Sequence, residues 1–356
     1  MKGSWSRLRQ CLAIVLLPIA LFLAACDSDS TEPRLPEYSE VAVVMNSIER
    51  SLSIIPIDEP GSAFTIGVSP EGTPVDVAVR DEIAVVPLGT YPFVAVVDLV
   101  EGEVVHTVAL PEGSGATGAA FLNDSIAIVG NPGRNSVSPV NVLRGTAGDE
   151  IEVGVYPESL IGVGREVYVF NSKLDENWTP AEPGSITVIG ADLEVERTIE
   201  LSGYNPGAAV VGTDGRLYVL NSGSFGLGNG SLSVVDPVRG VEVEHYEGFG
   251  DFPGSITWSP RGTVLVGVYE AGIVEWDPSN GGSFIRGLDD PLTPGDTPPV
   301  AGIGFDSRER LFVLNPGYCL DPGVAHILSA DGEPIDQVTI GVCPMELAFT
   351  ELPETR

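Results

Sequence analysis

Acidic and aromatic side chains gather in a few long segments of this chain, and they are the residues best suited to bind a ligand. Carboxylates can coordinate a cation or exchange a proton, and aromatic side chains offer a broad apolar surface. We predict one aromatic and acidic binding site. Its candidate residues are Asp175, Glu176, Trp178, Phe225, Tyr318, Asp289, Asp290 and Asp296.

Two acidic pairs in this set, Asp289–Asp290 and Asp175–Glu176, could hold a calcium ion together with backbone carbonyls. The signal has low specificity, because the spaced acidic pattern of a calcium-binding loop is absent from the sequence. We therefore expect no cofactor and no metal, with calcium as the alternative.

The motifs of common catalytic sites are absent from the sequence. It contains no Cys-x-x-Cys-His for haem, no Gly-x-Ser-x-Gly nucleophile turn and no Walker A loop. The glycine-rich segment 226–230 lacks the strand and helix of a nucleotide site, so we interpret it as a flexible turn. The three histidines, His106, His245 and His326, fall in different predicted strands and lack the spacing of a metal site. These observations weaken hydrolase and metalloenzyme interpretations.

The N-terminal segment indicates export. Basic residues precede an apolar run over residues 11–25, which is short for a bilayer span and typical of a secretory signal. The run ends in Leu23-Ala24-Ala25-Cys26, which resembles the bacterial lipobox. That resemblance implies cleavage before Cys26 and attachment of acyl chains to this residue. The alternative is an ordinary signal, or a membrane anchor, with a chance cysteine.

The sequence therefore divides into three parts. Residues 1–25 are the predicted signal peptide, residues 26–40 a lipidated cysteine followed by a polar tether, and residues 41–356 the folded body. The tether has a root-mean-square reach of roughly 20 Å. We expect a protein of the bacterial cell envelope, anchored to a membrane through the lipid on Cys26, with its body in the periplasm or outside the cell.

The charge of the chain is strongly negative. There are 50 acidic residues against 18 basic ones, and the net charge is −32. This balance excludes nucleic acid as a partner and disfavours contact with anionic lipid through a basic surface. We interpret the excess as a solvated acidic surface rather than as a dedicated cation-binding surface.

A unit of about 45 residues recurs seven times along the body. Each unit opens with a short apolar strand, and five of these seven strands end in Asn. The opening strands span residues 41–46, 83–87, 126–131, 167–171, 217–221, 264–268 and 311–315. A second and a third strand follow in each unit, then a Gly-x-x-Pro step such as Gly154 to Pro157, and then a fourth strand.

Four short strands per unit predict an all-β fold, a seven-bladed β-propeller with four antiparallel strands in each blade. The last apolar segment, residues 346–350, has the pattern of a first strand. We expect this C-terminal strand to complete the blade that begins at residue 41 and to close the ring, leaving no open edge.

The opening Tyr-Val-x-Asn strand, the Ser-Val-Val-Asp strand and the Gly-x-x-Pro step resemble the YVTN-repeat β-propellers. The resemblance covers residues 41–356, and the units that open at 167, 217 and 311 match best. The second unit departs from the pattern, with Pro87 in place of Asn and no Pro after Gly115, and the sixth unit lacks the Asn. The family implies a shape and a compartment, but members include binding proteins, surface proteins and enzymes.

Strand order predicts which face binds. Loops between the second and third strands of a blade open on the same face as the blade-to-blade connections, and we call it the top face. The long segments all fall there, over residues 171–184, 221–230, 287–299 and 315–323. Loop elaboration on one face marks the binding face of a propeller. Tyr156, Tyr204 and Phe252, beside the Gly-x-x-Pro steps, either join this site or wedge between blades. We expect the strand-ending asparagines to bond loop backbone, with contact to a ligand as the alternative.

Cys319 and Cys343 fall in a top-face loop and in a blade-to-blade step, so both lie on one face of the predicted propeller. In an oxidising compartment this pattern predicts a disulfide, which would stabilise the last repeat by about 3 kcal/mol. A metal pair is the weaker alternative, because no His or third Cys lies near them in the sequence.

From these observations we predict a non-catalytic binding or interaction module whose top face takes a protein, a glycan or a small ligand. The alternative is an enzyme, a lyase or hydrolase with a carboxylate site at the top mouth of the central channel. Carboxylates that converge on the axis with perturbed protonation would favour it. A purely structural envelope protein would have no concave polar pocket.

Overall fold

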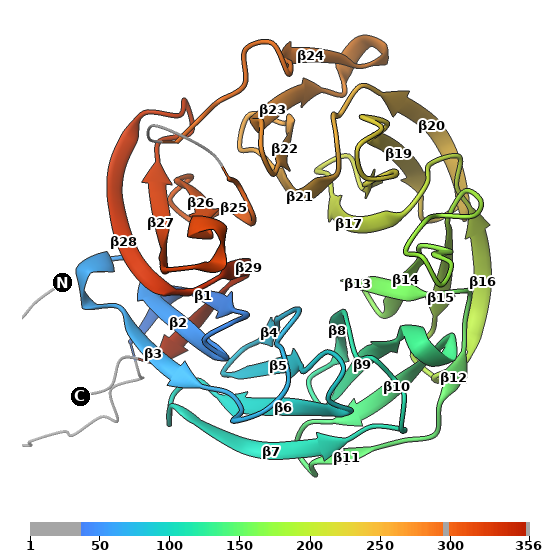
Figure 1. The fold of residues 1–356 in the computed structure, drawn as a ribbon, viewed down its shortest axis with the longest axis vertical. Coiled ribbons are helices and arrows are strands. Elements are labelled where there is room, and N and C mark those ends of the chain that lie inside the picture. The colour runs from blue at the N-terminus through green and yellow to red at the C-terminus, as the bar shows by residue number, and fades with distance from the viewer. Residues whose placement is uncertain (1–36, 295–298, 354–356) are drawn as a thin grey trace, which may run out of the picture. The chain divides into compact units, whose positions relative to one another are not determined.

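The computed structural model describes residues 37–294 and 299–353, which form seven antiparallel sheets around a central axis (Figure 1). We number them blade 1 to blade 7. Blade 1 comprises β29 (Pro344–Pro353), β1 (Tyr38–Asn46), β2 (Ser51–Pro56) and β3 (Phe64–Gly67). Blade 2 comprises β4 (Ala78–Arg80), β5 (Ile83–Pro87), β6 (Phe93–Asp98) and β7 (Glu103–Ala109). Blade 3 comprises β8 (Ala119–Asn123), β9 (Ile126–Asn131), β10 (Ser136–Asn141) and a split outer strand, β11 (Thr146–Ala147) and β12 (Ile151–Glu152).

The remaining four blades follow in chain order. Blade 4 comprises β13 (Pro157–Val163), β14 (Glu166–Asn171), β15 (Ser185–Ile189) and β16 (Val195–Glu200). Blade 5 comprises β17 (Pro206–Val211), β18 (Leu217–Asn221), β19 (Ser231–Asp236) and β20 (Val241–Glu247). Blade 6 comprises β21 (Pro253–Trp258), β22 (Val264–Val268), β23 (Gly272–Asp277) and β24 (Ser283–Arg286). Blade 7 comprises β25 (Ile303–Phe305), β26 (Leu311–Asn315), β27 (Pro322–Leu328) and β28 (Pro334–Val342).

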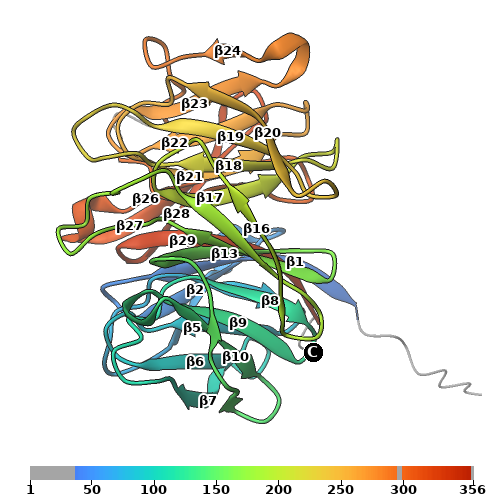
Figure 2. The ribbon, with the colours of Figure 1, turned by 90° about the vertical axis from the view of Figure 1, so that its right-hand side faces the viewer.

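The predicted opening strands are confirmed as the second strand of each blade. Five of the seven have the predicted bounds, while β1 begins earlier, at Tyr38, and β14 begins at Glu166. These strands are apolar without interruption because neighbouring blades cover both of their faces. Seven apolar clusters fill the spaces between blades, and the one between blades 5 and 6 contains Tyr218, Phe249 and Trp276. Seen from the side, the sheets are twisted layers packed against one another (Figure 2).

The predicted closure of the propeller is also confirmed. Strand β29 pairs antiparallel with β1 from Asn46 opposite Pro344 to Tyr38 opposite Pro353. The innermost strands β29 and β4 lie in contact, as do β25 and β29, so the last strand of the chain fills the place between blades 7 and 2. The innermost strands of the seven blades then form a continuous ring around the axis.

The asparagines that end the second strands have a structural role. The Nδ2 group of Asn171 donates to the hydroxyls of Ser185 and Thr187 on the neighbouring strand, at 3.3 Å and 3.0 Å. Asn46, Asn131 and Asn221 contact hydroxyls of their own blades in the same way. These four side chains thus bond mainly to side-chain hydroxyls and not to loop backbone. Asn315 does bond loop backbone, as expected from the sequence, because its Oδ1 accepts from the N–H of Gly317 at 3.0 Å.

The glycine of the Gly-x-x-Pro step packs against this asparagine. A Cβ atom added at Gly154 would lie 2.5 Å from Cγ of Asn171, so only glycine fits there. The serine after the asparagine links blades, since Oγ of Ser222 donates to the carbonyl of Pro253 in the next blade at 2.9 Å. Asn, Gly and Pro therefore recur together because they build one joint between successive blades.

Candidate functional site

The Gly-x-x-Pro steps connect the outermost strand of one blade to the innermost strand of the next, which begins at the mouth of the central channel. The residue before the proline has a left-handed backbone, with φ of 57° at Tyr156, 50° at Phe252 and 64° at Cys343. A β-bulge follows the proline in blades 1, 4, 5 and 6 and interrupts the register at the start of the innermost strand. In blades 1 and 4, residues just after the proline, Glu346 and Glu158, line the top mouth of the channel.

A cavity of about 610 Å³ opens at this mouth, over blades 2, 3 and 4. Loops β5–β6, β9–β10 and β14–β15 form its rim through Thr90, Pro132 and Trp178. A second cavity of about 190 Å³ continues from it between the innermost strands. The volume of the upper cavity is in the range of small-molecule sites.

Three carboxylates from three different blades line this cavity: Asp76 ahead of β4, Glu158 on β13 and Glu346 on β29. Asp76 accepts hydrogen bonds from the backbone N–H groups of Val77 and Ala119, each at 2.7 Å. Glu158 accepts one from Oγ of Ser172 at 2.5 Å, and Glu346 one from the N–H of Leu347 at 3.3 Å. The residues lining the two cavities include no Lys, Arg or His.

The protonation of these carboxylates is perturbed by burial. Burial raises the pKa of Asp76 to about 6, although two backbone N–H groups act to lower it. Burial, and then the charge of Asp76, raise the pKa of Glu346 to about 8. Burial also raises the pKa of Glu158, against the hydrogen bond from Ser172. Asp76 and Glu346 interact, so the pair holds about one proton at neutral pH.

An aromatic wall faces the carboxylates. The rings of Tyr156 and Trp178 meet edge to face, with centroids 5.6 Å apart. Burial and the nearby Glu158 raise the pKa of Tyr156 to about 12, so its phenol stays a hydrogen-bond donor at neutral pH. Trp178 is 71% exposed, which is unusual for so large an apolar side chain and leaves its ring free to cover a ligand.

Tyr156, which the sequence left between this site and a wedge between blades, lines the cavity, whereas Tyr204 and Phe252 do not. Among the eight candidate residues, the one described residue that lines the cavity is Trp178. Asp175 and Glu176 lie beside it in the β14–β15 loop and are exposed. The carboxylate of Asp175 accepts hydrogen bonds from the N–H groups of Asn177 and Thr179, at 2.8 Å and 3.0 Å. Asp175 thus shapes the turn that presents Trp178.

The other predicted residues lie elsewhere. Phe225 is 83% exposed, and its ring packs against Phe252 at 6.0 Å. Tyr318 is exposed beside the disulfide, and Asp289 and Asp290 are exposed on the connection that follows β24. Asp296 lies outside the described residues. The structure therefore does not gather the predicted set into one site.

Sequence reasoning missed Asp76, Glu158 and Glu346. A signal was present, because these acids stand one or two residues after the proline of the step. The matching positions in blades 5 and 6 carry small residues, Gly207-Ala208 and Gly254-Ser255. Acidic side chains at positions that otherwise hold Gly, Ala or Ser indicate a use other than packing.

Within residues 37–294 and 299–353, no three His, Cys, Asp or Glu side chains are grouped so that they could hold a metal ion. His106, His245 and His326 lie on β7, β20 and β27, in three different blades. In the same ranges, no helix is long and apolar enough to cross a membrane.

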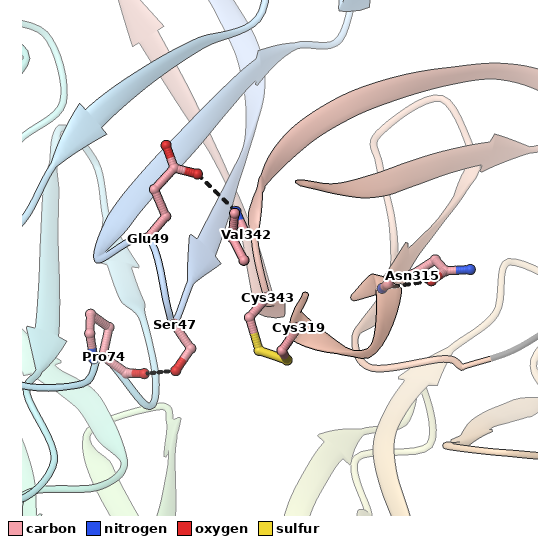
Figure 3. Close-up of a disulfide and its surroundings, with 8 residues drawn as sticks. Ser47, Glu49, Pro74, Asn315, Cys319, Val342 and Cys343 are labelled. Carbon is pink, nitrogen blue, oxygen red and sulfur yellow. Dashed lines mark hydrogen bonds between the residues drawn. A yellow bond between two sulfur atoms is a disulfide. The ribbon is translucent and has the colours of Figure 1, made fainter. Parts of the chain in front are cut away.

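The predicted disulfide between Cys319 and Cys343 is confirmed (Figure 3). It ties the β26–β27 loop to the start of β29, with the Cα atoms 4.3 Å apart. The same step is held by Glu49, whose carboxylate accepts from the N–H of Val342 at 2.8 Å (Figure 3). Since Cys343 stands three residues before Glu346, these bonds fix the backbone that positions this carboxylate.

No protein-family model and no curated protein matches the sequence. Solved structures match the fold. The hydrazine synthase of Kuenenia stuttgartiensis is 20% identical with a TM-score of 0.63, over 78% of this chain and 91% of that one. A functionally unknown protein from Desulfotomaculum acetoxidans is 16% identical with a TM-score of 0.64, over 88% and 99%. A streptogramin B lyase is 13% identical with a TM-score of 0.58, over 79% and 91%. Similarity at these identities establishes the β-propeller fold of this chain and leaves its activity open.

Proposed function

We propose that this chain is an exported lipoprotein whose propeller binds a small ligand, without catalysis, at the top mouth of its central channel. The observation that carries the proposal is the cavity of about 610 Å³, which combines an aromatic wall with three carboxylates. Concave sites with mostly apolar walls and a few convergent polar groups are typical of small-molecule sites. A purely structural role predicted no such pocket.

The export and anchoring parts of the proposal rest on the N-terminal sequence. The lipobox-like segment around Cys26 and the resemblance to YVTN-repeat propellers both favour a protein of the cell envelope. Strand β1 begins at Tyr38, which lies beside the β4–β5 turn on the face opposite the top face. The predicted tether would therefore join the body on the face opposite the cavity.

Capture of small molecules from cell extract tests the binding function. The body from residue 28 onward would be incubated with extract and washed, and retained molecules identified by mass spectrometry. We expect a molecule that the wild type retains and that Trp178→Ala loses, because Trp178 lines the cavity. Phe225→Ala is the matched control, an exposed aromatic on the same face outside the cavity. Equal retention by wild type and both variants, or retention by none, would contradict the proposal.

The anchor is tested separately with the full chain. Labelled palmitate fed to a bacterial host should enter the wild-type protein and not Cys26→Ser. Incorporation that does not depend on Cys26 would reject the anchor without touching the ligand site.

An enzymatic function at the same site is the second candidate, and it meets the criterion stated from the sequence, because carboxylates with raised pKa converge at the mouth of the channel. The observation that favours it is the pair of Asp76 and Glu346, one ionised and one protonated at neutral pH. This is the state in which two carboxyl groups act as base and acid. A retained molecule that is converted by the wild type, and left intact by Asp76→Asn, would identify a lyase or hydrolase.

A further inference from the structure

We infer that the ligand of this cavity is an organic cation, an amine or a quaternary ammonium group held between the aromatic wall and the three carboxylates. The inference rests on the ligand-binding function proposed above. It assigns a charge and a chemical class to the ligand of that site.

The first argument is the missing counter-charge. The titratable side chains that line the two cavities are Asp76, Tyr156, Glu158 and Glu346. The innermost strands of blades 3, 5, 6 and 7 contribute only uncharged residues to the lining, and so do the β5–β6 and β9–β10 loops. An anionic ligand would meet carboxylates alone, whereas a cation would supply the charge that is absent.

Basic residues of the surrounding loops are engaged elsewhere. Arg134, next to the rim residues Pro132 and Gly133, forms an ion pair with Glu150 at 2.6 Å. Lys173, in the segment that leads to Trp178, contacts Glu200 at 3.4 Å. Neither side chain is among the residues that line the cavity.

The second argument is a contrast with two more deeply buried carboxylates of this protein, since Asp76, Glu158 and Glu346 are only partly buried at the cavity. Asp306 is 5% exposed and pairs with Arg310 at 2.7 Å. Glu275 is 6% exposed and pairs with Arg261 at 3.2 Å. This chain thus supplies an arginine where it buries an acid in a blade, and three carboxylates without a basic partner at one cavity indicate a cation from outside.

The third argument is the aromatic wall. A cation is attracted to the face of an indole or phenol ring, Trp gives the strongest contact of this kind, and the contact strengthens when a bound ligand excludes water from it. Trp178 projects from a turn that Asp175 holds in shape, and it meets Tyr156 edge to face at the rim. This pair adds aromatic surface to a cavity that the three carboxylates also line.

The protonation of the site makes the inference testable through pH. At pH 7 the Asp76–Glu346 pair holds about one proton, and a bound cation favours the ionised form. Binding should therefore release up to one proton, and affinity should rise as pH increases toward 8, by at most tenfold per unit. Above the pKa of Glu346, about 8, the affinity should level off.

The experiment compares cations with neutral molecules of the same shape. Choline, tetramethylammonium and spermidine would be titrated calorimetrically into the full body, with 3,3-dimethyl-1-butanol as the neutral counterpart of choline. Titrations at pH 6.5, 7.5 and 8.5 in buffers of different ionisation enthalpy give the number of protons released. We expect at least one cation to bind tenfold or more tightly than neutral counterparts, more strongly at pH 8.5, with net proton release.

Variants distinguish a role in binding from damage to the fold. Glu346→Gln should weaken the cation and abolish proton release, while Trp178→Leu should weaken it and keep the release. Glu176→Gln is the matched control, an exposed acid two residues from Trp178, and it should change neither. A variant that is merely destabilised would not lose proton release while the other variant keeps it, so affinity and proton release together distinguish binding from damage to the fold.

Two results would overturn the inference. One is that no cation of the panel binds more tightly than its neutral counterpart; the other is cation binding without dependence on Glu346 and Trp178. If the extract experiment still yields a neutral or anionic molecule that requires Trp178, the ligand-binding function stands and only the cationic class is wrong. If nothing binds in either experiment, both are wrong.

Discussion

Replacing Glu346 by Gln should stabilise the fold, and the gain should depend on pH. The pKa of Glu346 is 4.5 in an unfolded chain and about 8 in the folded protein, where burial and Asp76 oppose its ionisation. Between these values the native state binds a proton that the unfolded state has lost. The free energy of unfolding of the wild type therefore falls as pH rises from 4.5 to 8.

The size of the effect follows from the shift. Each pKa unit corresponds to about 1.4 kcal/mol, so the full shift would cost about 5 kcal/mol above pH 8. Part of the carboxyl group faces the cavity, where water lowers this cost, and we expect roughly 2 kcal/mol for Glu346→Gln at pH 8.5. Below pH 4.5 the carboxyl is neutral in both states, and the difference should be near zero.

Chemical denaturation at pH 4.5, 6.5 and 8.5 would measure this gain. The fluorescence of Trp276, which is 2% exposed in the core between blades 5 and 6, reports unfolding. Glu176→Gln, at an exposed position, should leave stability unchanged at all three pH values. A gain of Glu346→Gln that is equal at pH 4.5 and 8.5 would refute the assignment of a buried, protonated Glu346.

Three further predictions concern the joints between blades, and each is measured as a change in denaturation midpoint. Reducing the disulfide, or replacing both cysteines by Cys319→Ser and Cys343→Ser, should lower the free energy of unfolding by about 3 kcal/mol. It should also weaken ligand retention, because the disulfide fixes the start of β29. Unchanged retention in the reduced protein would show that the disulfide does not support the site. Gly154→Ala should lower the stability of the fold, because the added Cβ would clash with Asn171. Gly254→Ala should leave stability unchanged, because nothing lies within 4 Å of the added Cβ. Equal effects of the two substitutions would contradict the proposed joint. Asn171→Ala should cost about 2 kcal/mol, since two buried hydroxyls lose their partner, and a neutral effect would reject this role.

The fold was predictable because the residues that join successive blades lie close together in the sequence of each unit. The strand-ending asparagine, the glycine that packs on it and the proline that starts the next blade recur in most of the units, so periodicity locates them without knowledge of tertiary contacts. The pairing of β29 with β1 was predictable because the first repeat lacks a first strand and the last segment of the chain supplies one. Strand bounds then agree because both faces of each second strand must be apolar.

The site was not predictable in the same way. Asp76, Glu158 and Glu346 are far apart in the chain, and only closure of the propeller brings them to one cavity, with a bulge after the proline beside Glu158 and Glu346. Among the 50 acidic residues of the chain, these three do not stand out. Loop length instead drew attention to Phe225 and Tyr318, which the structure leaves exposed outside the cavity.

The positions of Asp76 and Glu346 explain why their protons are coupled. Both lie two residues after the proline that begins a blade, and their blades are neighbours in the propeller ring. The repeat thus places two equivalent positions side by side, and acids at both repel each other wherever no cation intervenes. Their ionisation destabilises the fold at high pH, and a bound cation would offset that cost. Stabilisation by the ligand should therefore be larger at pH 8.5 than at pH 6.5, which links the stability of the propeller to occupation of its cavity.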